Sequence, residues 1–409
     1  MCNNGVILSG VEGSRAITMK TIEQKAKKVP TIRFAGFDDE WVEKKLGDVA
    51  NSFGYGLNAA AMPYDGINKY LRITDIDDLS REFKKDDLTT PDFDLVKASD
   101  YRLDEGDLLF ARTGASVGKT FIYKKNDGLV YFAGFLIRTK IKSEYDSKFI
   151  FQNTLTNLYD KFVKITSQRS GQPGINAQEY ADYSLLMPKL NEQQKIGSFF
   201  SNIDSLISLE QKKYDKLVQV KKSMLEKMFP KEGATVPEIR FAGFSGDWEK
   251  DEFSNIITVH PFKPYLAEPH IGGKIEVIQQ GNDPIAGYAN GKPFEDYKNV
   301  TLFGDHTVSL YKARNPFFVA SDGLKILSSK KTSPNFFYHM LDRFKPIPEG
   351  YKRHFMILLE RECYYPKEKT EQNLISSYLN SLDSLISLQQ RKLEKLKNIK
   401  KSLLEKMFV

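Results

Sequence analysis

The stretch Asp204-Ser-Leu-Ile-Ser-Leu209 recurs letter for letter as Asp383-Ser-Leu-Ile-Ser-Leu388. The two copies lie inside longer segments, residues 192–229 and 371–408, which align without a gap and are identical at 22 of 38 positions. An internal repeat this close indicates that the chain is built from two related halves.

Each copy of the repeat is predicted to form one long helix. A proline stands just upstream of each copy, and Asn191 and Thr370 are expected to serve as N-caps. Counted in sevens from Ile196 and from Ile375, each copy has ten a and d positions, eight of them apolar. At 1.5 Å per residue, 38 residues span roughly 57 Å. We therefore predict two long helices paired as an antiparallel coiled coil, with two separate amphipathic helices as the alternative.

The two heptad series are interrupted by polar residues at equivalent positions. The interruptions are Glu210 and Lys221 in the first copy, and Gln389 and Lys400 in the second. Their coincidence indicates that both helices share one register.

A second, shorter repeat opens each half. Residues 30–37 read Pro-Thr-Ile-Arg-Phe-Ala-Gly-Phe and are followed by Trp41, and residues 237–244 read Pro-Glu-Ile-Arg-Phe-Ala-Gly-Phe and are followed by Trp248. The order opener, variable block, long helix thus occurs twice, although the two blocks show no evident similarity to each other. A duplicated frame with unlike contents indicates two modules that do the same job on different targets.

The variable blocks combine short β-rich runs with one helical segment each, at 147–156 and 334–342, which predicts an α+β fold with a pseudo-twofold internal repeat. The β-rich runs are at residues 107–112, 121–123, 130–132, 135–140, 274–279, 307–310, 316–320 and 324–327. The expected domains are a disordered N-terminal tail (1–29), a first mixed α/β domain (30–188), a first helix (189–230), a second mixed α/β domain (231–365) and a second helix (366–409). Met19 looks like a more natural start than Met1.

The composition is that of a globular protein with a slight basic excess. The 409 residues are 41% hydrophobic and 28% charged, with a net charge of +7, which permits an anionic partner without requiring one. Cys2 and Cys363 are the only cysteines, which fits a reducing cytoplasm. No apolar run approaches the roughly 18 residues of a membrane span, and the first 18 residues lack a secretory pattern.

Several segments come close to catalytic motifs, but each lacks an essential part. Gly114-Ala-Ser-Val-Gly-Lys-Thr120 has three residues between its glycines where a P-loop needs four. Asn315-Pro-Phe-Phe318 lacks the second proline of an amino-methyltransferase motif, and the five histidines have no metal-binding spacing. A stand-alone DNA methyltransferase or nucleotide hydrolase is therefore an alternative that these incomplete motifs disfavour.

Polar and basic loops are the candidate DNA contacts. Gly-rich turns offer backbone N–H groups to phosphates, whereas Arg, Gln and Asn side chains can read base edges. The alternative for each loop is a solvated turn with no ligand. The candidates are Arg112, Thr113, Ser116, Lys119, Arg169, Ser170, Gln172 and Asn176 in the first block, and Gln279, Gln280, Asn282, His306, Tyr351, Lys352, Arg353 and His354 in the second.

The whole arrangement resembles the specificity subunit of type I restriction-modification systems. The resemblance rests on the openers at 33–41 and 240–248, the loops at 112–118 and 170–176, and the two repeated helices. It implies that each block is a target recognition domain that reads one half of a bipartite site in double-stranded DNA. The second block lacks a Gly-Gln-Pro-Gly-Ile-Asn segment and has Tyr351-Lys-Arg-His354 in the corresponding place.

The resemblance also implies what surrounds the chain. The helices would set the spacer between the half-sites and dock two modification subunits, which restriction subunits join in a cytoplasmic complex without a membrane. This chain would bind no cofactor, whereas S-adenosylmethionine, ATP and Mg²⁺ would lie on the partner subunits. The repeated surface letters expected to dock the partners are Lys213, Lys216, Glu226 and Lys227, which recur as Lys392, Lys395, Glu405 and Lys406. A coiled-coil adaptor that does not bind DNA is the remaining alternative.

Overall fold

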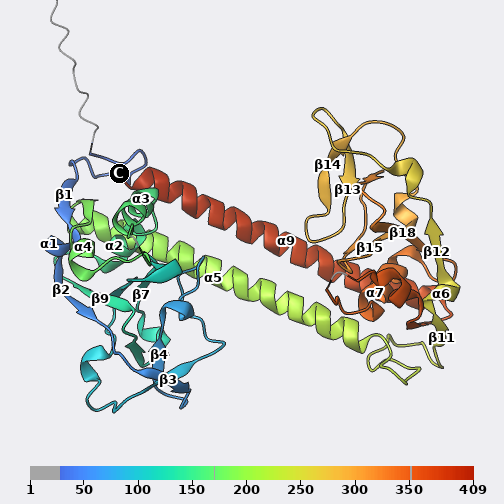
Figure 1. Cartoon of the computed structure of the whole chain (residues 1–409), viewed down its shortest axis with the longest axis horizontal. Helices are drawn as coiled ribbons and strands as arrows, with labels where there is room; N and C mark the ends of the chain where they lie inside the picture. Colours follow the sequence, from blue (N-terminus) through green and yellow to red (C-terminus); the bar gives the residue numbers. More distant parts are fainter. Residues whose placement is uncertain (1–27, 170, 351) are drawn as a thin grey trace, which may run out of the picture. The chain divides into compact units, whose positions relative to one another are not determined.

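The computed structural model describes residues 28–169, 171–350 and 352–409 (Figure 1). The expected disordered tail, apart from its last two residues, lies outside the described residues, as do Ser170 and Tyr351. The described chain divides into two compact units. The first runs to Asp204 and includes Ile399–Val409, and the second is Ser205–Asn398.

The two predicted long helices are present as α5 (Leu190–Lys227) and α9 (Lys369–Met407). Both begin earlier than their expected caps, because Asn191 and Thr370 already lie in the first helical turn. The N-cap prediction was therefore wrong.

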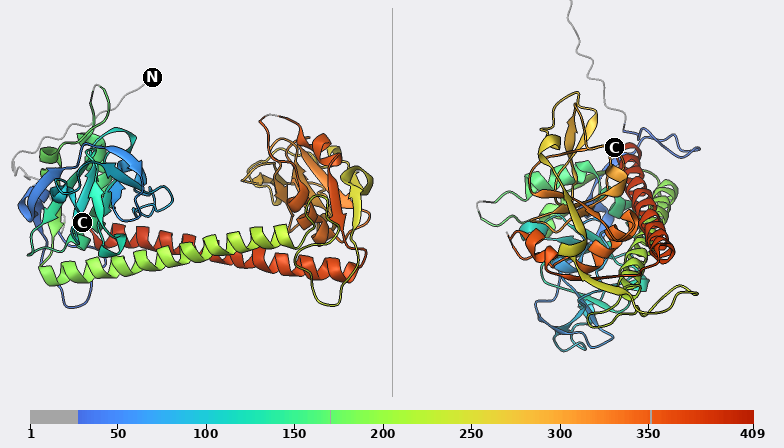
Figure 2. Two further views of the ribbon diagram at one scale, coloured as in Figure 1. Left: turned by 90° about the horizontal axis from the view of Figure 1, so that it is seen from below. Right: turned by 90° about the vertical axis from the view of Figure 1, so that its right-hand side faces the viewer.

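The two helices pack together in each unit, with the end of α9 beside the start of α5 in the first (Figure 2). In the second unit, the amide of Gln389 donates to the Glu210 carboxylate at 2.5 Å, and Lys221 pairs with Asp383 at 2.6 Å. Residues that come later in α5 contact residues that come earlier in α9, so the two helices are antiparallel. Every predicted a and d position is buried or half-buried, which confirms the shared register and excludes two separate helices.

The main sheet of the first unit is antiparallel, with the strand order β2-β9-β6-β7. These strands are β2 (Ala50–Tyr55), β9 (Leu136–Ile141), β6 (Leu108–Ala111) and β7 (Thr120–Ile122). Three small two-stranded sheets accompany it: β1 (Val42–Lys45) with β10 (Ser184–Met187), β3 (Ala60–Pro63) with β5 (Thr89–Asp92), and β4 (Lys69–Leu71) with β8 (Val130–Phe132).

The main sheet of the second unit has the equivalent strand order, β12-β18-β15-β16. Its strands are β12 (Ile257–His260), β18 (Leu324–Ser329), β15 (Thr301–Gly304) and β16 (Leu310–Tyr311). The accompanying strands are β11 (Glu249–Glu252) with β19 (Glu362–Tyr365), and β14 (Ile285–Ala289) with β13 (Ile275–Ile278) and β17 (Phe318–Val319).

The two blocks therefore share a fold that their sequences did not reveal. The equivalence extends to the short helices α1 (Leu46–Val49) and α6 (Phe253–Ile256), α2 (Ser147–Asn153) and α7 (Pro334–Phe344), and α4 (Ala177–Ala181) and α8 (His354–Leu359), while α3 (Asn157–Thr166) is an addition to the first block. Most predicted strands are found, but the turn at residues 305–307 includes Thr307, and residues 308 and 309 lie outside any strand. Val308 has a φ of 55°, which lies in the left-handed region and interrupts extended backbone.

The duplicated openers tie each block to the helices. Arg33 binds Glu192 at the start of α5 through two hydrogen bonds of 2.7 and 2.8 Å, and this bonding raises the pKa of Arg33. Arg240 binds Glu371 at the start of α9 in the same way, at 2.8 and 2.9 Å. Both glutamate side chains are 1% exposed, so each contact is a buried bidentate ion pair. We call these two pairs the opener clamps.

The same openers also reach the end of the other helix. The Ile32 N–H donates to the carbonyl of Lys406 in α9, and the Ile239 N–H donates to that of Lys227 in α5, each at 2.9 Å. These bonds satisfy carbonyls that a helix terminus leaves without an internal partner. Each opener thus joins the start of one long helix to the end of the other.

Candidate nucleic-acid interface

Two loops predicted to contact DNA lie side by side in the first unit. The Gly114 N–H donates to the Pro173 carbonyl at 3.0 Å, and the Ile175 N–H donates to the Arg112 carbonyl at 2.9 Å. Gly114 has a φ of 70°, which a residue with a side chain would rarely adopt. Segments about 60 residues apart in the sequence therefore form one surface beyond the end of β6.

The side chains on this surface differ in their solvent exposure and in their contacts. Gln172 is exposed, whereas Thr113 and Ser116 are half-buried at the loop surface. The Arg112 guanidinium lies 4.9 Å from the centre of the Tyr55 ring, in a cation–π contact. This contact orients Arg112 at the edge of the sheet.

Three predicted contacts of the first block are already used inside the protein. Lys119 is buried and pairs with Asp78 at 2.5 Å. Arg169 pairs with Glu179, and the Asn176 side chain accepts from the Glu179 N–H at 3.0 Å as the N-cap of α4. These residues hold the loops in shape.

The predicted loops of the second unit also converge, and they do so around Asp305. The His354 N–H donates to the Asp305 carbonyl at 2.7 Å, and the Phe355 N–H donates to its carboxylate at 2.9 Å. The Asp305 N–H in turn donates to the Gly323 carbonyl at 2.8 Å. Asp305 is buried just after β15, the strand equivalent to β6, so both blocks assemble their loops at the same edge of the sheet. Asp305 was not among the predicted site residues.

The predicted residues of this second surface divide in the same way. His354 is buried, and its Nε2 accepts from the Glu349 N–H at 2.9 Å. The Gln280 side chain accepts from the His306 N–H at 2.9 Å, and the Gln279 amide donates to the Asp283 carbonyl at 2.9 Å. The exposed members are Asn282, Lys352 and Arg353.

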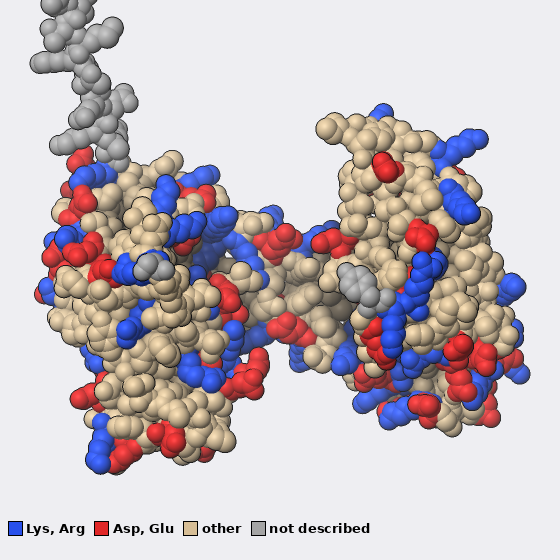
Figure 3. Space-filling view, in the orientation of Figure 1, with Lys and Arg blue, Asp and Glu red and all other residues tan. Residues whose placement is uncertain are grey.

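Charge is mixed over both units. Figure 3 shows basic and acidic side chains interspersed on the visible face of each unit. Lys352 illustrates this pairing, since it lies 2.8 Å from Glu349, and their hydrogen bond lowers the pKa of Glu349. A phosphate would compete with such exposed, weak pairs.

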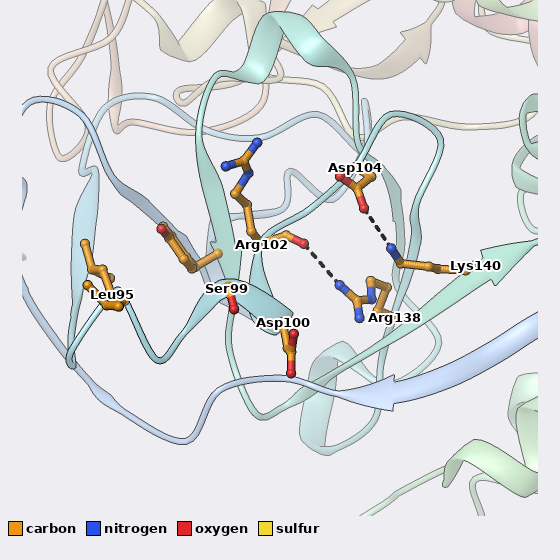
Figure 4. Close-up of a pocket in the computed structure, with 9 residues that line it drawn as sticks. Leu95, Ser99, Asp100, Arg102, Asp104, Arg138 and Lys140 are labelled. Carbon is orange, nitrogen blue, oxygen red and sulfur yellow. Dashed lines mark hydrogen bonds and ion pairs between the residues drawn. The ribbon is translucent and has the colours of Figure 1, made fainter.

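A hollow of about 710 Å³ lies in the first unit, lined in part by Asp100, Arg102 and Tyr131 (Figure 4). Lys140 pairs there with Asp104 at 2.7 Å, and Arg138 donates to the Arg102 carbonyl at 3.1 Å. These basic side chains already have partners within the fold.

The residues predicted to dock partners have mixed environments. Lys213 and Lys392 both pair with the buried Glu210, each at 3.0 Å. Glu405 accepts from Asn157 at 3.1 Å. The remaining predicted side chains are exposed: Lys216, Glu226, Lys227, Lys395 and Lys406.

The prediction overlooked the apolar residues on the outer faces of the long helices. Leu206 and Leu209 are 40% and 50% exposed, and their repeats Leu385 and Leu388 are 50% and 56% exposed. All four stand in the stretch that is repeated letter for letter, and none occupies an a or d position. Exact repetition of apolar residues outside the a and d positions was the sequence feature that could have identified them.

The catalytic near-motifs do not become sites. Thr120 begins β7, so Gly114–Thr120 is followed by a strand rather than by the helix of a P-loop. Within residues 28–169, 171–350 and 352–409, no cluster of His, Cys, Asp and Glu suits a metal ion. In the same part of the chain, no helix has the length and apolar character needed to cross a membrane.

Known proteins share both the sequence and the fold. A family model described as the type I restriction modification DNA specificity domain matches residues 38–219. The type I restriction enzyme MjaVIII specificity subunit of Methanocaldococcus jannaschii is 22% identical, over 90% of this chain and 91% of that protein. The S subunit of a type I restriction-modification system from M. genitalium has a similar fold, with a TM-score of 0.60, 14% identity, and coverage of 93% of this chain and 99% of that one.

These similarities define a class of DNA-specificity proteins. Residues 38–219 match the DNA specificity domain of type I restriction-modification systems, and the chain is similar over 90% of its length to a specificity subunit of such a system.

Proposed function

We propose that each variable block reads one half of a bipartite DNA site, and that the paired helices set the spacer between the halves. The observation that carries the proposal is the convergence of loops at the same edge of two equivalent sheets, at Gly114–Pro173 in one block and Asp305–His354 in the other. Unlike loops on like scaffolds suit the reading of two different half-sites.

The accessible side chains are the proposed direct contacts. They are Arg112, Thr113, Ser116 and Gln172 in the first block, and Asn282, Lys352 and Arg353 in the second, joined by Ser170 and Tyr351 outside the described residues. The residues proposed to hold the loops are Lys119, Arg169, Asn176, Gln279, Gln280 and His354, whose side chains are bonded within the protein, and His306, which is bonded through its backbone N–H.

We further propose that the outer faces of α5 and α9 dock two modification subunits. Leu206 with Leu209 and Leu385 with Leu388 form two matched apolar pairs, each spaced by three residues on one helix face. The flanking exposed lysines and glutamates would form the polar rim of each interface. S-adenosylmethionine would then be bound by the modification subunits, and ATP and Mg²⁺ by the restriction subunits of the cytoplasmic complex.

The half-site assignment is tested by mapping methylated sites in a host that carries the complete system. Gln172→Ala should weaken recognition of one half-site about tenfold, and Arg353→Ala should do the same for the other, because each loss removes a contact to one half only. Lys97→Ala, an exposed substitution of the first block outside both loops, is the control. A variant of either block that altered both halves equally would contradict the proposal.

A further inference from the structure

The second polar interruption of each heptad series forms an ion pair across the helix pair. Lys221 lies 2.6 Å from Asp383, and Lys400 lies 2.6 Å from Asp204. The two lysine side chains are only 18% and 15% exposed. Under the constant offset of the repeat, each pair becomes the other. We call these two contacts the register pairs.

Each register pair also includes a side chain of the neighbouring block. In the first unit, the Gln152 amide of α2 donates to the Asp204 carboxylate at 2.7 Å. In the second unit, Asp342 of α7 lies 3.6 Å from the Lys221 ammonium. Each pair therefore joins both long helices to the helix that supports one block.

The apolar seam alone does not specify one alignment of the helices. A heptad repeat places apolar residues opposite one another again after a slip of seven residues. After such a slip, Lys221 would face Gln390 or Ser376, and Lys400 would face Gln211 or Gly197. Neither lysine would meet an aspartate, and a poorly solvated charge without its partner is costly.

We propose that the register pairs mark the two ends of the helical segment that sets the spacer, and that they thereby determine the spacing between the half-sites. This inference rests on the function proposed above. Lys221 follows Asp204 by 17 residues in α5, and Lys400 follows Asp383 by the same number in α9. The segment between the pairs spans roughly 26 Å at 1.5 Å per residue. Outside it, both helices belong to the cores of the blocks.

The test compares full-length chains on duplexes that carry both half-sites with the preferred spacer, or with a spacer one base pair longer or shorter. Lys400→Met removes the charge and keeps a long side chain in the seam. It should lower the preference for the normal spacer about tenfold, the effect of losing a partly buried pair, while the half-site sequences stay the same. Lys401→Met, at an exposed neighbouring lysine, should leave the preference unchanged.

Exchanging the charges separates register from stability. The double variant Asp204→Lys with Lys400→Asp restores an ion pair, and the Gln152 amide can turn its oxygen towards the new lysine. It should recover the narrow spacer preference. The exchange of Lys221 with Asp383 should recover less, because Asp342 would then face an aspartate.

The outcomes distinguish the two proposals. A wild-type chain without any spacer preference would contradict the proposal that the paired helices set the spacer. A normal wild-type preference that Lys400→Met leaves intact would contradict only the register pairs. If Lys400→Met does not fold, the exchange variant decides: a narrow preference supports the register pairs, and a broad preference overturns them.

Discussion

The two halves of the chain agree where they hold the long helices and differ where their loops face outward. The opener clamps match almost atom for atom, with bond lengths of 2.7 and 2.8 Å in one half and 2.8 and 2.9 Å in the other. The loops at the sheet edges have no such match: one closes through Gly114 and Pro173, and the other through Asp305. The residues that attach each block to the long helices are therefore the same in both halves, whereas the loop surfaces share only the strands that support them.

Breaking an opener clamp should have the largest effect. Arg33→Ala leaves the buried Glu192 carboxylate without its partner and should destabilise the first unit by about 3 to 5 kcal/mol. Arg240→Ala should cost the second unit a similar amount. Trp41 and Trp248 are the only tryptophans and lie one in each unit, so Trp248→Phe and Trp41→Phe backgrounds allow urea unfolding of each unit to be followed separately.

Lys45→Ala is the matched control for the clamps. Lys45 pairs with Asp182 at 2.8 Å, but both side chains are more than half exposed, so its loss should destabilise the first unit far less than the loss of a clamp. Equal losses for Lys45→Ala and Arg33→Ala would show that the clamps contribute no more than surface pairs.

The repeated leucines sharpen the comparison at the helix surface. Leu206→Glu with Leu209→Glu should remove one modification subunit, and the same changes at Leu385 and Leu388 should remove the other, because a charge would have to be buried in each interface. Mass photometry of the assembled complex counts the bound subunits. Since these leucines are exposed, the free chain should lose at most about 0.5 kcal/mol of stability. Two bound subunits on the fourfold variant would exclude this surface.

The smallest expected effect concerns the hydrogen bond between Glu210 and Gln389, which occupy equivalent positions in the two helices. Hydrogen bonds from Gln389, then from Lys392 and Lys213, lower the pKa of Glu210 from its ordinary 4.5 to about 2. A lowered pKa stabilises the fold above pH 4.5, and this contribution is lost as the pH falls towards 2. Thermal unfolding at pH 6 and pH 3 should show a smaller acid-induced drop for Glu210→Gln than for the wild type. Glu394→Gln, at an exposed position, is the control. If Glu210→Gln showed the same acid-induced drop as the wild type, the lowered pKa of Glu210 would be contradicted.

The repeat made the frame of this fold predictable from sequence. Heptad spacing predicted the two helices and their shared register, because helical periodicity is local information. The common strand order of the blocks was hidden, since many sequences satisfy the same alternation of buried and exposed positions. Among the site residues, type and loop position identified candidates but gave no measure of burial. Lys119 is held inward by Asp78, and His354 is held inward by the Asp305 carbonyl; both partners lie elsewhere in the sequence.

The most direct test of the central claim inserts four residues at equivalent points of both helices, after Lys212 and after Arg391. The insertion lengthens each helix by about 6 Å, close to two base pairs at roughly 3.4 Å each, and its extra rotation of about 40° is a stutter that coiled coils absorb. Mapping the methylated sites of the complete system should return the same two half-site sequences with a longer spacer. Altered half-site bases with an unchanged spacer would contradict the account.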